Sequence, residues 1–292
     1  MPAPVLTVTL NPAVDKTVDG PRVKLSAGGK GINVSRALKT LGVDSVVTGF
    51  AGGRPGDFIR SALKKERISE RLVGIRGASR QNLTVIGRGG KTTRRIEKGP
   101  AVSAKEFVEF KKAFVKLLRG RRYVVFSGAN ANGLKDSAYA ELIRIAKKNG
   151  VMTVLDTRDA ALKEGLRARP DIVKPNIEEA RYICGKGTLE CLRAKGARTV
   201  LLTMGAAGAA ATDGRDTVIA RPPKAGAVNN VGCGDAFLAG FIAYRLKGRD
   251  FKDSVRAATA AGTANAAAKA ACLVPGSFKK KDFLEILRQT DV

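Results

Sequence analysis

One short segment of the chain, Gly232-Cys233-Gly234-Asp235, has residue types that suit anion chemistry. An apolar helical stretch follows at once, so the unpaired N–H groups of its first turn would point at a bound anion, and the glycines would let the backbone approach it. Asp235 allows two interpretations. It could cap the helix, which the spacing alone favours, or it could accept a proton from a substrate hydroxyl beside a bound phosphate.

The chain contains no histidine. Ser–His–Asp hydrolysis, Cys–His proteolysis and His-ligated zinc are therefore excluded, and a general base must come from Asp, Glu, Lys, Tyr or Cys. The four cysteines form no Cys-x-x-Cys pair and no zinc-like spacing. We expect reduced, mostly buried thiols, as in cytosolic proteins, at Cys184, Cys191, Cys233 and Cys272.

Two further glycine-rich turns are candidates for ligand binding. Residues 28–33, Gly-Gly-Lys-Gly-Ile-Asn, lead into a predicted helix but lack the Gly-Lys-Ser/Thr ending of a P-loop. A plain tight turn and an anion site built around Lys30 both remain open there. Residues 203–208, Thr-Met-Gly-Ala-Ala-Gly, follow an apolar strand, and such turns at the carboxyl edge of a parallel sheet commonly hold nucleotides.

The elements that must position these turns alternate along the chain. Helical spacing of apolar residues predicts helices that end near Gly120 and Gly150, the first opened by a capping box, and most of the C-terminal third is also helical. Short apolar runs predict strands at residues 123–126, 151–155, 172–173 and 199–203. Apolar strands between amphipathic helices indicate an α/β fold with a parallel sheet covered on both faces. Residues 82–97, with a glycine turn at 89–90, predict a β-hairpin that could serve as a lid.

Composition limits the class of protein. The 292 residues include 53 Lys+Arg and 26 Asp+Glu, a formal net charge of +27, and 44% are hydrophobic, which is enough for a core. No apolar run approaches the roughly 18 residues of a membrane span, and the first residues do not resemble a secretory signal. We therefore expect a soluble, cytoplasmic protein that makes no membrane contact and forms a single domain over residues 1–292.

The glycine turns are a much more specific sign of a protein family when they are combined with two further segments. These are Asn-Pro-Ala-Val-Asp at residues 11–15 and Lys-Pro-Asn-Ile-Glu-Glu at residues 174–179. The chain resembles the ribokinase-like sugar kinases of the phosphofructokinase B type, in the branch of 1-phosphofructokinase and tagatose-6-phosphate kinase. The matching segments keep the family's order over nearly the whole chain; they are residues 9–15, 28–37, 80–82, 127–128, 173–179, 203–208 and 231–240. The resemblance implies a three-layer αβα sandwich with a mainly parallel central sheet and a small β-lid.

The resemblance also implies a reaction and the residues that perform it. The reaction is ATP- and Mg²⁺-dependent phosphoryl transfer to a hydroxyl of a phosphorylated ketohexose, with fructose 1-phosphate the favoured acceptor and fructose 1,6-bisphosphate the product. Asp235 matches the catalytic base, and Gly232, Cys233 and Gly234 match the anion hole. The positions that match sugar-binding residues are Asp15, Gly29, Lys30, Asn33, Arg80, Asn82 and Ser127. Those that match nucleotide-binding residues are Thr203, Gly205, Gly208, Asn176 and Asn265, and Asn176 and Glu179 match the pair that organises magnesium.

Several of these positions also have plainer interpretations. Asp15 could cap a turn, Arg80 could pair with a surface carboxylate, and Asn176 with Glu179 could simply begin a helix. Asparagine and aspartate commonly occupy turns and helix starts, so neither interpretation is excluded by residue type.

Three segments depart from the family's pattern. Residues 16–27 are fewer than the corresponding lid segment, Ala129 replaces a hydroxyl-bearing residue, and Arg158 and Asp159 replace small residues. A shortened lid would exclude water less well. We therefore expect slower turnover or a different acceptor, and either a homodimer or, because the lid often carries the dimer contact, a monomer.

Two alternatives remain at this point. The first is a catalytically degenerate kinase fold that binds nucleic acid or another polyanion through its excess positive charge; it is not favoured, because only 5% of residues are aromatic and no nucleic-acid module is recognisable. The second is a different acceptor, as in 6-phosphofructokinase or tagatose-6-phosphate kinase. The sequence does not settle which hydroxyl is phosphorylated.

Overall fold

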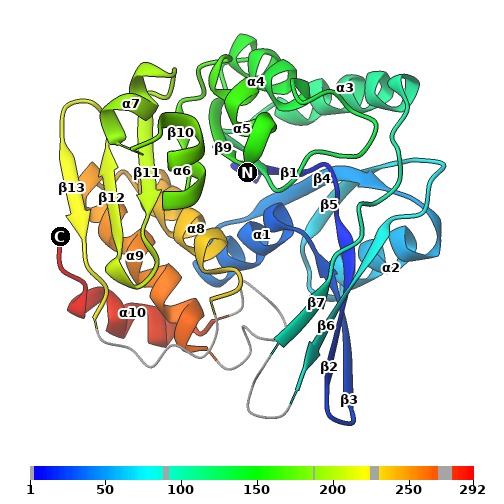
Figure 1. The fold of residues 1–292 in the computed structure, drawn as a ribbon, viewed down its shortest axis with the longest axis horizontal. Coiled ribbons are helices and arrows are strands. Elements are labelled where there is room, and N and C mark those ends of the chain that lie inside the picture. Colours follow the sequence, from blue (N-terminus) through cyan, green and yellow to red (C-terminus); the bar gives the residue numbers. More distant parts are fainter. Residues whose placement is uncertain (1–2, 88–91, 187, 224–229, 269–277) are drawn as a thin grey trace.

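The computed structural model describes residues 3–87, 92–186, 188–223, 230–268 and 278–292, and a nine-stranded sheet runs through its centre (Figure 1). The strand order across this sheet is β13-β12-β11-β10-β9-β8-β1-β4-β5. In chain order the strands are β1 (Val5–Thr9), β4 (Ser45–Ala51), β5 (Ser69–Gly74), β8 (Tyr123–Ser127), β9 (Met152–Asp156), β10 (Ile172–Val173), β11 (Thr199–Thr203), β12 (Ala209–Thr212) and β13 (Thr217–Ala220).

The direction in which strands are added reverses beside β1. From β1 the chain adds β4 and β5 on one side, whereas β8 joins the other side and β9, β10 and β11 extend it. All of these neighbours pair in parallel, and only β12 and β13 pair antiparallel. Ligands of open α/β sheets bind at the carboxyl ends of the strands near such a reversal. The carboxyl edge around β1 and β8 is therefore the expected place for a site.

Helices cover both faces of the sheet (Figure 1), and each face has its own apolar core. One core contains apolar residues of α1 (Lys30–Thr40), α8 (Cys233–Leu246), α9 (Phe251–Ala267) and α10 (Lys280–Gln289). The other contains apolar residues of α3 (Ala104–Leu118), α4 (Ala138–Lys148), α5 (Asp159–Leu166), α6 (Ile177–Cys184) and α7 (Leu189–Ala194). The predicted three-layer αβα arrangement with a mainly parallel sheet is confirmed. The capping box that opens α3 is present as well, with Ser103 and Glu106 bonded to each other's backbone N–H groups.

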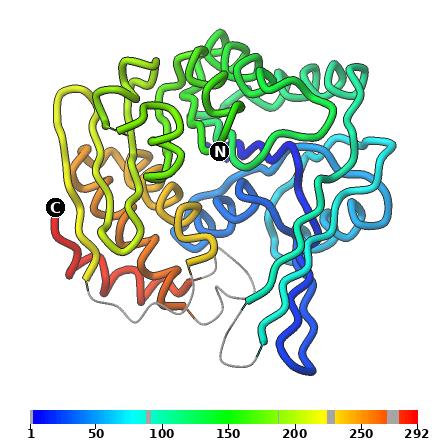
Figure 2. Tube along the Cα trace, viewed as in Figure 1, coloured from blue at the N-terminus to red at the C-terminus, as the bar shows by residue number. Residues whose placement is uncertain are grey.

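A second, four-stranded sheet projects from the body in the order β3-β2-β6-β7, beside α2 (Gly53–Lys65). It consists of β2 (Ala13–Asp19), β3 (Arg22–Gly28), β6 (Arg80–Ile86) and β7 (Thr92–Arg95), so segments far apart in sequence lie side by side (Figure 2). The hairpin strands expected within residues 82–97 correspond to β6 and β7, while the turn at 88–91 lies outside the described residues. The short segment 16–27 forms most of the β2–β3 hairpin.

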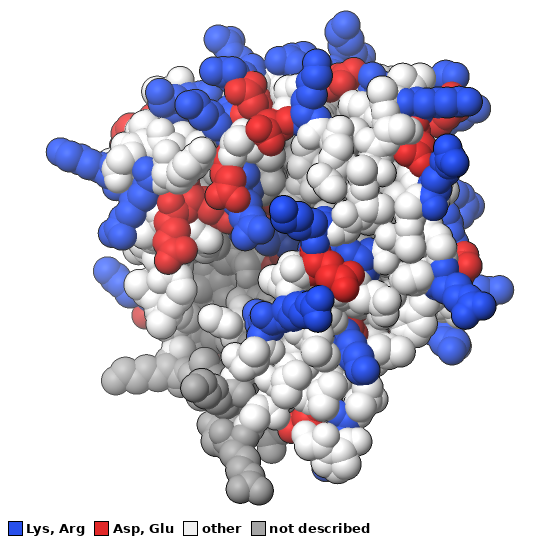
Figure 3. Space-filling model, turned by 45° about the vertical axis from the view of Figure 1, so that its right-hand side comes forward, with Lys and Arg blue, Asp and Glu red and all other residues white. Residues whose placement is uncertain are grey.

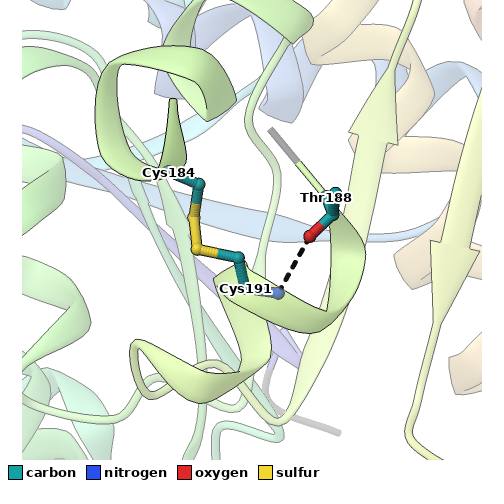
Figure 4. Close-up of a disulfide and its surroundings, with 3 residues drawn as sticks. All are labelled: Cys184, Thr188 and Cys191. Atoms are coloured by element: carbon teal, nitrogen blue, oxygen red, sulfur yellow. Dashed lines mark hydrogen bonds between the residues drawn. A yellow bond between two sulfur atoms is a disulfide. The ribbon is translucent and has the colours of Figure 1, made fainter. Parts of the chain in front are cut away.

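The cysteine prediction is wrong for two of the four residues. Cys184, at the end of α6, and Cys191, in α7, form a disulfide with Cα atoms 6.1 Å apart (Figure 4). Beside the disulfide, Thr188 caps α7, its hydroxyl accepting a hydrogen bond from the Cys191 N–H at 3.2 Å. The seven-residue separation of Cys184 and Cys191 does not by itself predict that they form a disulfide. Cys233 is partly buried, and Cys272 lies outside the described residues.

Within the described residues, no helix combines the length and apolar character needed to cross a membrane.

Candidate active site

The residues proposed for chemistry gather at the carboxyl edge of the central sheet. The strands β8, β9 and β10 end in turn at Ser127, Asp156 and Val173, with Lys174 following directly. The N-terminal ends of α1 and α8 lie at the same edge, where Lys30 of α1 donates to Asp156 and Asn33 of α1 donates to Asp235 of α8. This clustering follows from the parallel direction of the strands, since their carboxyl ends all meet one edge.

Asp235 is buried in the first turn of α8 and does not cap it. Gly232, in a left-handed conformation with φ of 78°, is the N-cap residue, and it makes no side-chain cap bond. The Asp235 Oδ2 atom accepts a hydrogen bond of 2.8 Å from the Asn33 Nδ2 of α1 instead. Because of burial first and the negative charge of Asp156 second, the pKa of Asp235 is raised to about 6, against the opposing effects of Lys30, Asn33 and Lys174. The cap interpretation that spacing favoured is wrong.

An ionic cluster lies beside Asp235, in which Asp156 and Lys174 are buried and Lys30 is 40% exposed. The Asp156 Oδ1 atom is 3.2 Å from Lys30 Nζ and 3.1 Å from Lys174 Nζ, and its Oδ2 accepts a 2.9 Å hydrogen bond from the Ser127 hydroxyl. Burial opposes the charge on Asp156, but the two lysines and the hydrogen bond hold the pKa of Asp156 below its usual value. Burial would likewise lower the pKa of Lys30, yet Asp156, Asp235 and Glu179 together raise it. The cluster therefore stays ionised.

Sequence reasoning missed Asp156 and Lys174 as site residues. Lys174 is only 4% exposed, and its Nζ would lie 3.1 Å from a Cβ atom placed on Gly234. It thus brings a positive charge directly against the glycine turn that precedes Asp235. The available signal was positional, because both residues stand where a parallel strand ends. Ser127 is fully buried, and its hydroxyl donates to Asp156.

The projecting sheet presents polar side chains on one face. Asp15 pairs across β2 and β6 with Asn82, whose Nδ2 donates to Asp15 Oδ1 at 2.7 Å, and Arg80 lies two residues before Asn82 on the same face. Burial raises the pKa of Asp15 against the hydrogen bond of Asn82 and the charge of Arg80. A Cβ atom at Gly28 would lie 2.0 Å from the Asp15 carboxylate, so only glycine fits there.

Arg80 is held by backbone carbonyls, not by a carboxylate. Its guanidinium donates to the Asn11 carbonyl at 3.1 and 2.9 Å and to the Glu97 carbonyl at 3.1 Å. Burial lowers the pKa of Arg80, and the nearby positive charge of Arg158 lowers it further against the opposing charge of Asp15. Arg158, which departs from the family's pattern, thus adds positive charge near Arg80, and sequence reasoning did not include it among the site residues.

The residues expected to hold a nucleotide border the same edge. Gly205 and Gly208 have positive φ angles of 60° and 93°, and a Cβ on Gly205 would meet open space. Thr203 pairs with Asn176 in an isolated parallel bridge, which joins this turn to the start of α6. Asn265 is fully buried in α9, and its Nδ2 donates to the Val231 carbonyl at 2.9 Å. Asn265 therefore stabilises the turn of residues 231–234 through this hydrogen bond.

Asn176 and Glu179 form a capping box at the start of α6. The Asn176 Oδ1 accepts from the Glu179 N–H at 2.8 Å, and the Glu179 Oε2 accepts from the Asn176 N–H at 2.9 Å. This is the arrangement of the plainer interpretation, a helix start. The charge of Glu179 also helps to raise the pKa of Lys30, so Glu179 acts electrostatically on the cluster. Among the described residues no three His, Cys, Asp or Glu side chains form a metal-binding group. The donors suit Mg²⁺, which commonly takes one or two carboxylates and completes its shell with water and phosphate.

Comparison with known proteins shows to which family this chain belongs. The sequence profile of the pfkB family carbohydrate kinases matches residues 5–275, nearly the whole chain. The chain is a pfkB family carbohydrate kinase. The predicted family is confirmed, as are the predicted enzyme class, a kinase, and the ribokinase-like fold.

Individual relatives of this pfkB kinase agree with the match. A tagatose-6-phosphate kinase from Staphylococcus epidermidis is 30% identical over 311 aligned positions, covering 99% of both chains. A 1-phosphofructokinase from Borreliella burgdorferi is 33% identical, covering 90% of this chain and 91% of its own. The crystal structure of phosphofructokinase-2 from Escherichia coli in complex with potassium is 25% identical with a TM-score of 0.90, covering 98% and 99%. Kinases of this family use ATP, which agrees with the predicted cofactor.

Proposed function

We propose that this pfkB kinase transfers the γ-phosphoryl group of ATP to a hydroxyl of a phosphorylated ketohexose, with fructose 1-phosphate the first acceptor to test. The observation that carries the proposal is the buried Asp235 in the first turn of α8, hydrogen-bonded to Asn33 and flanked by the Lys30–Asp156–Lys174 cluster. A carboxylate with a pKa raised to about 6 is ionised at neutral pH and still basic enough to take a proton.

In the proposed reaction, the substrate hydroxyl loses its proton to the Asp235 carboxylate while its oxygen attacks the γ-phosphorus. The bond from that phosphorus to the bridging oxygen breaks, and ADP leaves. The N–H groups of residues 232–234 and the positive charges of Lys30 and Lys174 would stabilise the transferring group, because phosphoryl transfer depends on positioning and electrostatics. Asn176 and Glu179 would hold Mg²⁺, which neutralises phosphate charge when it is bound.

The projecting sheet would bind the acceptor and cover it as a lid. Asp15 and Asn82 would contact the sugar hydroxyls, while Arg80, with Arg158 near it, would pair with the acceptor's own phosphate. Residues 203–208 would hold the nucleotide. Names of the relatives support acceptors of this class, since one relative is a tagatose-6-phosphate kinase and another a 1-phosphofructokinase. Hexulose 6-phosphates are therefore the second group to test.

A coupled ADP-release assay across a panel of sugar phosphates, with Asp235→Asn as the control, tests the proposal. We expect turnover of at least one ketohexose phosphate and its loss, by about a hundredfold or more, in the variant. Full activity of the variant would overturn the mechanism, and turnover of none of the panel would overturn the substrate class.

The excess positive charge beyond Lys30 and Arg80 is not explained by the proposed kinase activity. Figure 3 shows Lys and Arg side chains spread around the visible face with Asp and Glu side chains among them, without a single basic stripe. Nucleic-acid binding depends on phosphate neutralisation and falls steeply with salt. RNA binding measured against salt concentration, beside ATP turnover, distinguishes that alternative from the proposed kinase activity.

A further inference from the structure

Arg36 of α1 is a buried arginine whose guanidinium is linked to the proposed base, Asp235, through one intervening residue, Asn33. Its side chain is only 4% exposed. Its Nε and Nη2 donate to both oxygens of Glu66, at 2.6 and 2.8 Å, and Nη2 also donates to the Ala27 carbonyl at 2.7 Å. Its Nη1 donates to the Asn33 Oδ1 at 3.1 Å. Four of the five N–H groups of this guanidinium are therefore engaged, in the fixed fork geometry of arginine.

The contact to Asn33 determines which way its amide faces. A guanidinium only donates, so it can bind only the oxygen of the Asn33 amide. The Nδ2 group is then turned to Asp235, where it donates to Oδ2 at 2.8 Å. An ionised carboxylate only accepts, so the opposite orientation of the amide would leave both neighbours of Asn33 mispaired. The contacts form one continuous relay, Glu66 to Arg36 to Asn33 to Asp235.

We propose that Arg36, anchored by Glu66, is a positioning residue that fixes the Asn33 amide so that it donates to the Asp235 carboxylate. The proposal rests on the proposed function, because it concerns the residue assigned there as the base. The anchor lies at the end of α2, 30 residues from Arg36 along the chain, and the base lies 202 residues from Asn33. The relay thus joins the α2 side of the molecule to the first turn of α8.

Arg36 serves the acceptor side of the site as well. The Ala27 carbonyl that it holds directly precedes Gly28, whose backbone packs against the Asp15 carboxylate, and the charge of Arg36 opposes the effect of burial on the pKa of Asp15. The Arg36 guanidinium therefore holds both Asn33, which donates to the base, and the end of the strand beside Asp15. This explains why a full charge is retained at a buried position that touches no expected substrate atom.

The test compares Arg36→Met with Arg36→Lys, Asn33→Leu and the double variant Arg36→Met/Asn33→Leu. Arg60→Met is the matched control, because Arg60 also joins a carboxylate, that of Glu70, to a backbone carbonyl, that of Leu72, without reaching the site. Two readouts are required. One is the pH dependence of kcat/KM, and the other is the titration of the Asp235 carboxyl in the ligand-free protein by ¹³C NMR, assigned from its absence in Asp235→Asn.

We expect Arg36→Met to raise the pKa of Asp235, because the carboxylate loses an oriented donor, and so to move the acidic limb of the profile to higher pH. The other groups that face Asp235, namely Asp156, Lys30 and Lys174, are unchanged, as is Asp15 near Arg36. The value of kcat should fall roughly tenfold to a hundredfold with little change in KM for ATP. The pKa of Asp235 in Arg36→Lys should lie between the values in the parent and in Arg36→Met. Adding Arg36→Met to Asn33→Leu should produce no further shift of this pKa.

An Asp235 titration in Arg36→Met that matches the parent and Arg60→Met overturns the proposal, even if the variant melts at a lower temperature. Additive shifts in the double variant overturn it too, since Arg36 would then act independently of Asn33. If Arg36→Met does not fold, Arg36→Met/Glu66→Met, which leaves no unpaired carboxylate, and Glu66→Gln replace it under the same criteria. A normal Arg36→Met profile beside an inactive Asp235→Asn removes only this proposal, whereas an active Asp235→Asn removes the proposed function.

Discussion

The charge on Asp235 should make the folded protein less stable at neutral pH, and this cost can be measured. The pKa of Asp235 is about 6 in the folded chain, against an ordinary value of 3.8. The folded state therefore binds the proton more tightly than the unfolded state, so this group's contribution to stability is full below pH 3.8 and is lost as the pH rises towards 6. At 1.36 kcal/mol per pKa unit the loss is about 3 kcal/mol above that window.

The perturbation is Asp235→Asn, which removes the charge while its amide oxygen can still accept the hydrogen bond from Asn33. Relative to the parent, we expect the variant to gain about 3 kcal/mol in free energy of unfolding at pH 7.5 and only about 1 kcal/mol at pH 4.5. Urea denaturation at the two pH values measures both differences. Groups that do not interact with Asp235 titrate equally in both proteins and cancel.

Asp213→Asn supplies a control of opposite sign. Hydrogen bonds from the backbone N–H groups of Asp216 and Arg215 outweigh desolvation and hold the pKa of Asp213 below its ordinary value. Its charge therefore stabilises the fold at neutral pH, and the variant should lose stability at pH 7.5. If Asp235→Asn gained equally at both pH values, or lost stability at pH 7.5, the reasoning about the buried carboxylate would be refuted.

Three further predictions concern the surroundings of the base. Asp156→Asn should move the acidic limb of the kcat/KM profile to lower pH, because Asp235 loses a negative neighbour, and an unchanged limb would contradict this. The same variant should lower the free energy of unfolding by about 3 kcal/mol, since Lys174 stays buried without its carboxylate. Arg80→Met should raise KM for the sugar phosphate about tenfold to a hundredfold and leave KM for ATP unchanged, measured by steady-state kinetics; equal effects on both would place Arg80 elsewhere. The sequence left both a homodimer and a monomer open. Leu25 is 48% exposed on the projecting sheet, where Val23 and Val85 are exposed as well, so we expect self-association that Leu25→Lys abolishes in sedimentation velocity. A parent protein that sediments as a monomer would refute this.

Much of the fold could be predicted because its signals are local. The apolar runs that became β8, β9 and β11 and the capping box of α3 each occupy a few consecutive residues. The alternation of such elements specifies a parallel sheet covered on both faces, and the parallel direction in turn gathers the strand ends at one edge. The glycine turn before Asp235 was recognisable for the same reason.

The parts that could not be predicted depend on contacts between distant residues. Lys30 and Asp156 are 126 residues apart, and nothing local to either indicates that they form an ion pair. Asp235 was expected to cap α8 on spacing alone, because its bond to Asn33 of another helix is invisible in the sequence. The disulfide between Cys184 and Cys191 likewise depends on how α6 and α7 pack, which their separation along the chain does not reveal.

The position of α8 in the chain has a consequence for synthesis. Residues of α1 and α8 share one apolar core, and the partner that completes α1 is encoded more than 200 residues later. On a ribosome that adds about 5–20 residues per second, α1 would wait on the order of ten seconds or more for α8 to emerge. During that interval α1 can pack on β1 and β4, but its contact with α8 is missing and the nascent chain has no base. Catalytic competence would therefore appear late in synthesis, only after residue 235 has left the ribosome.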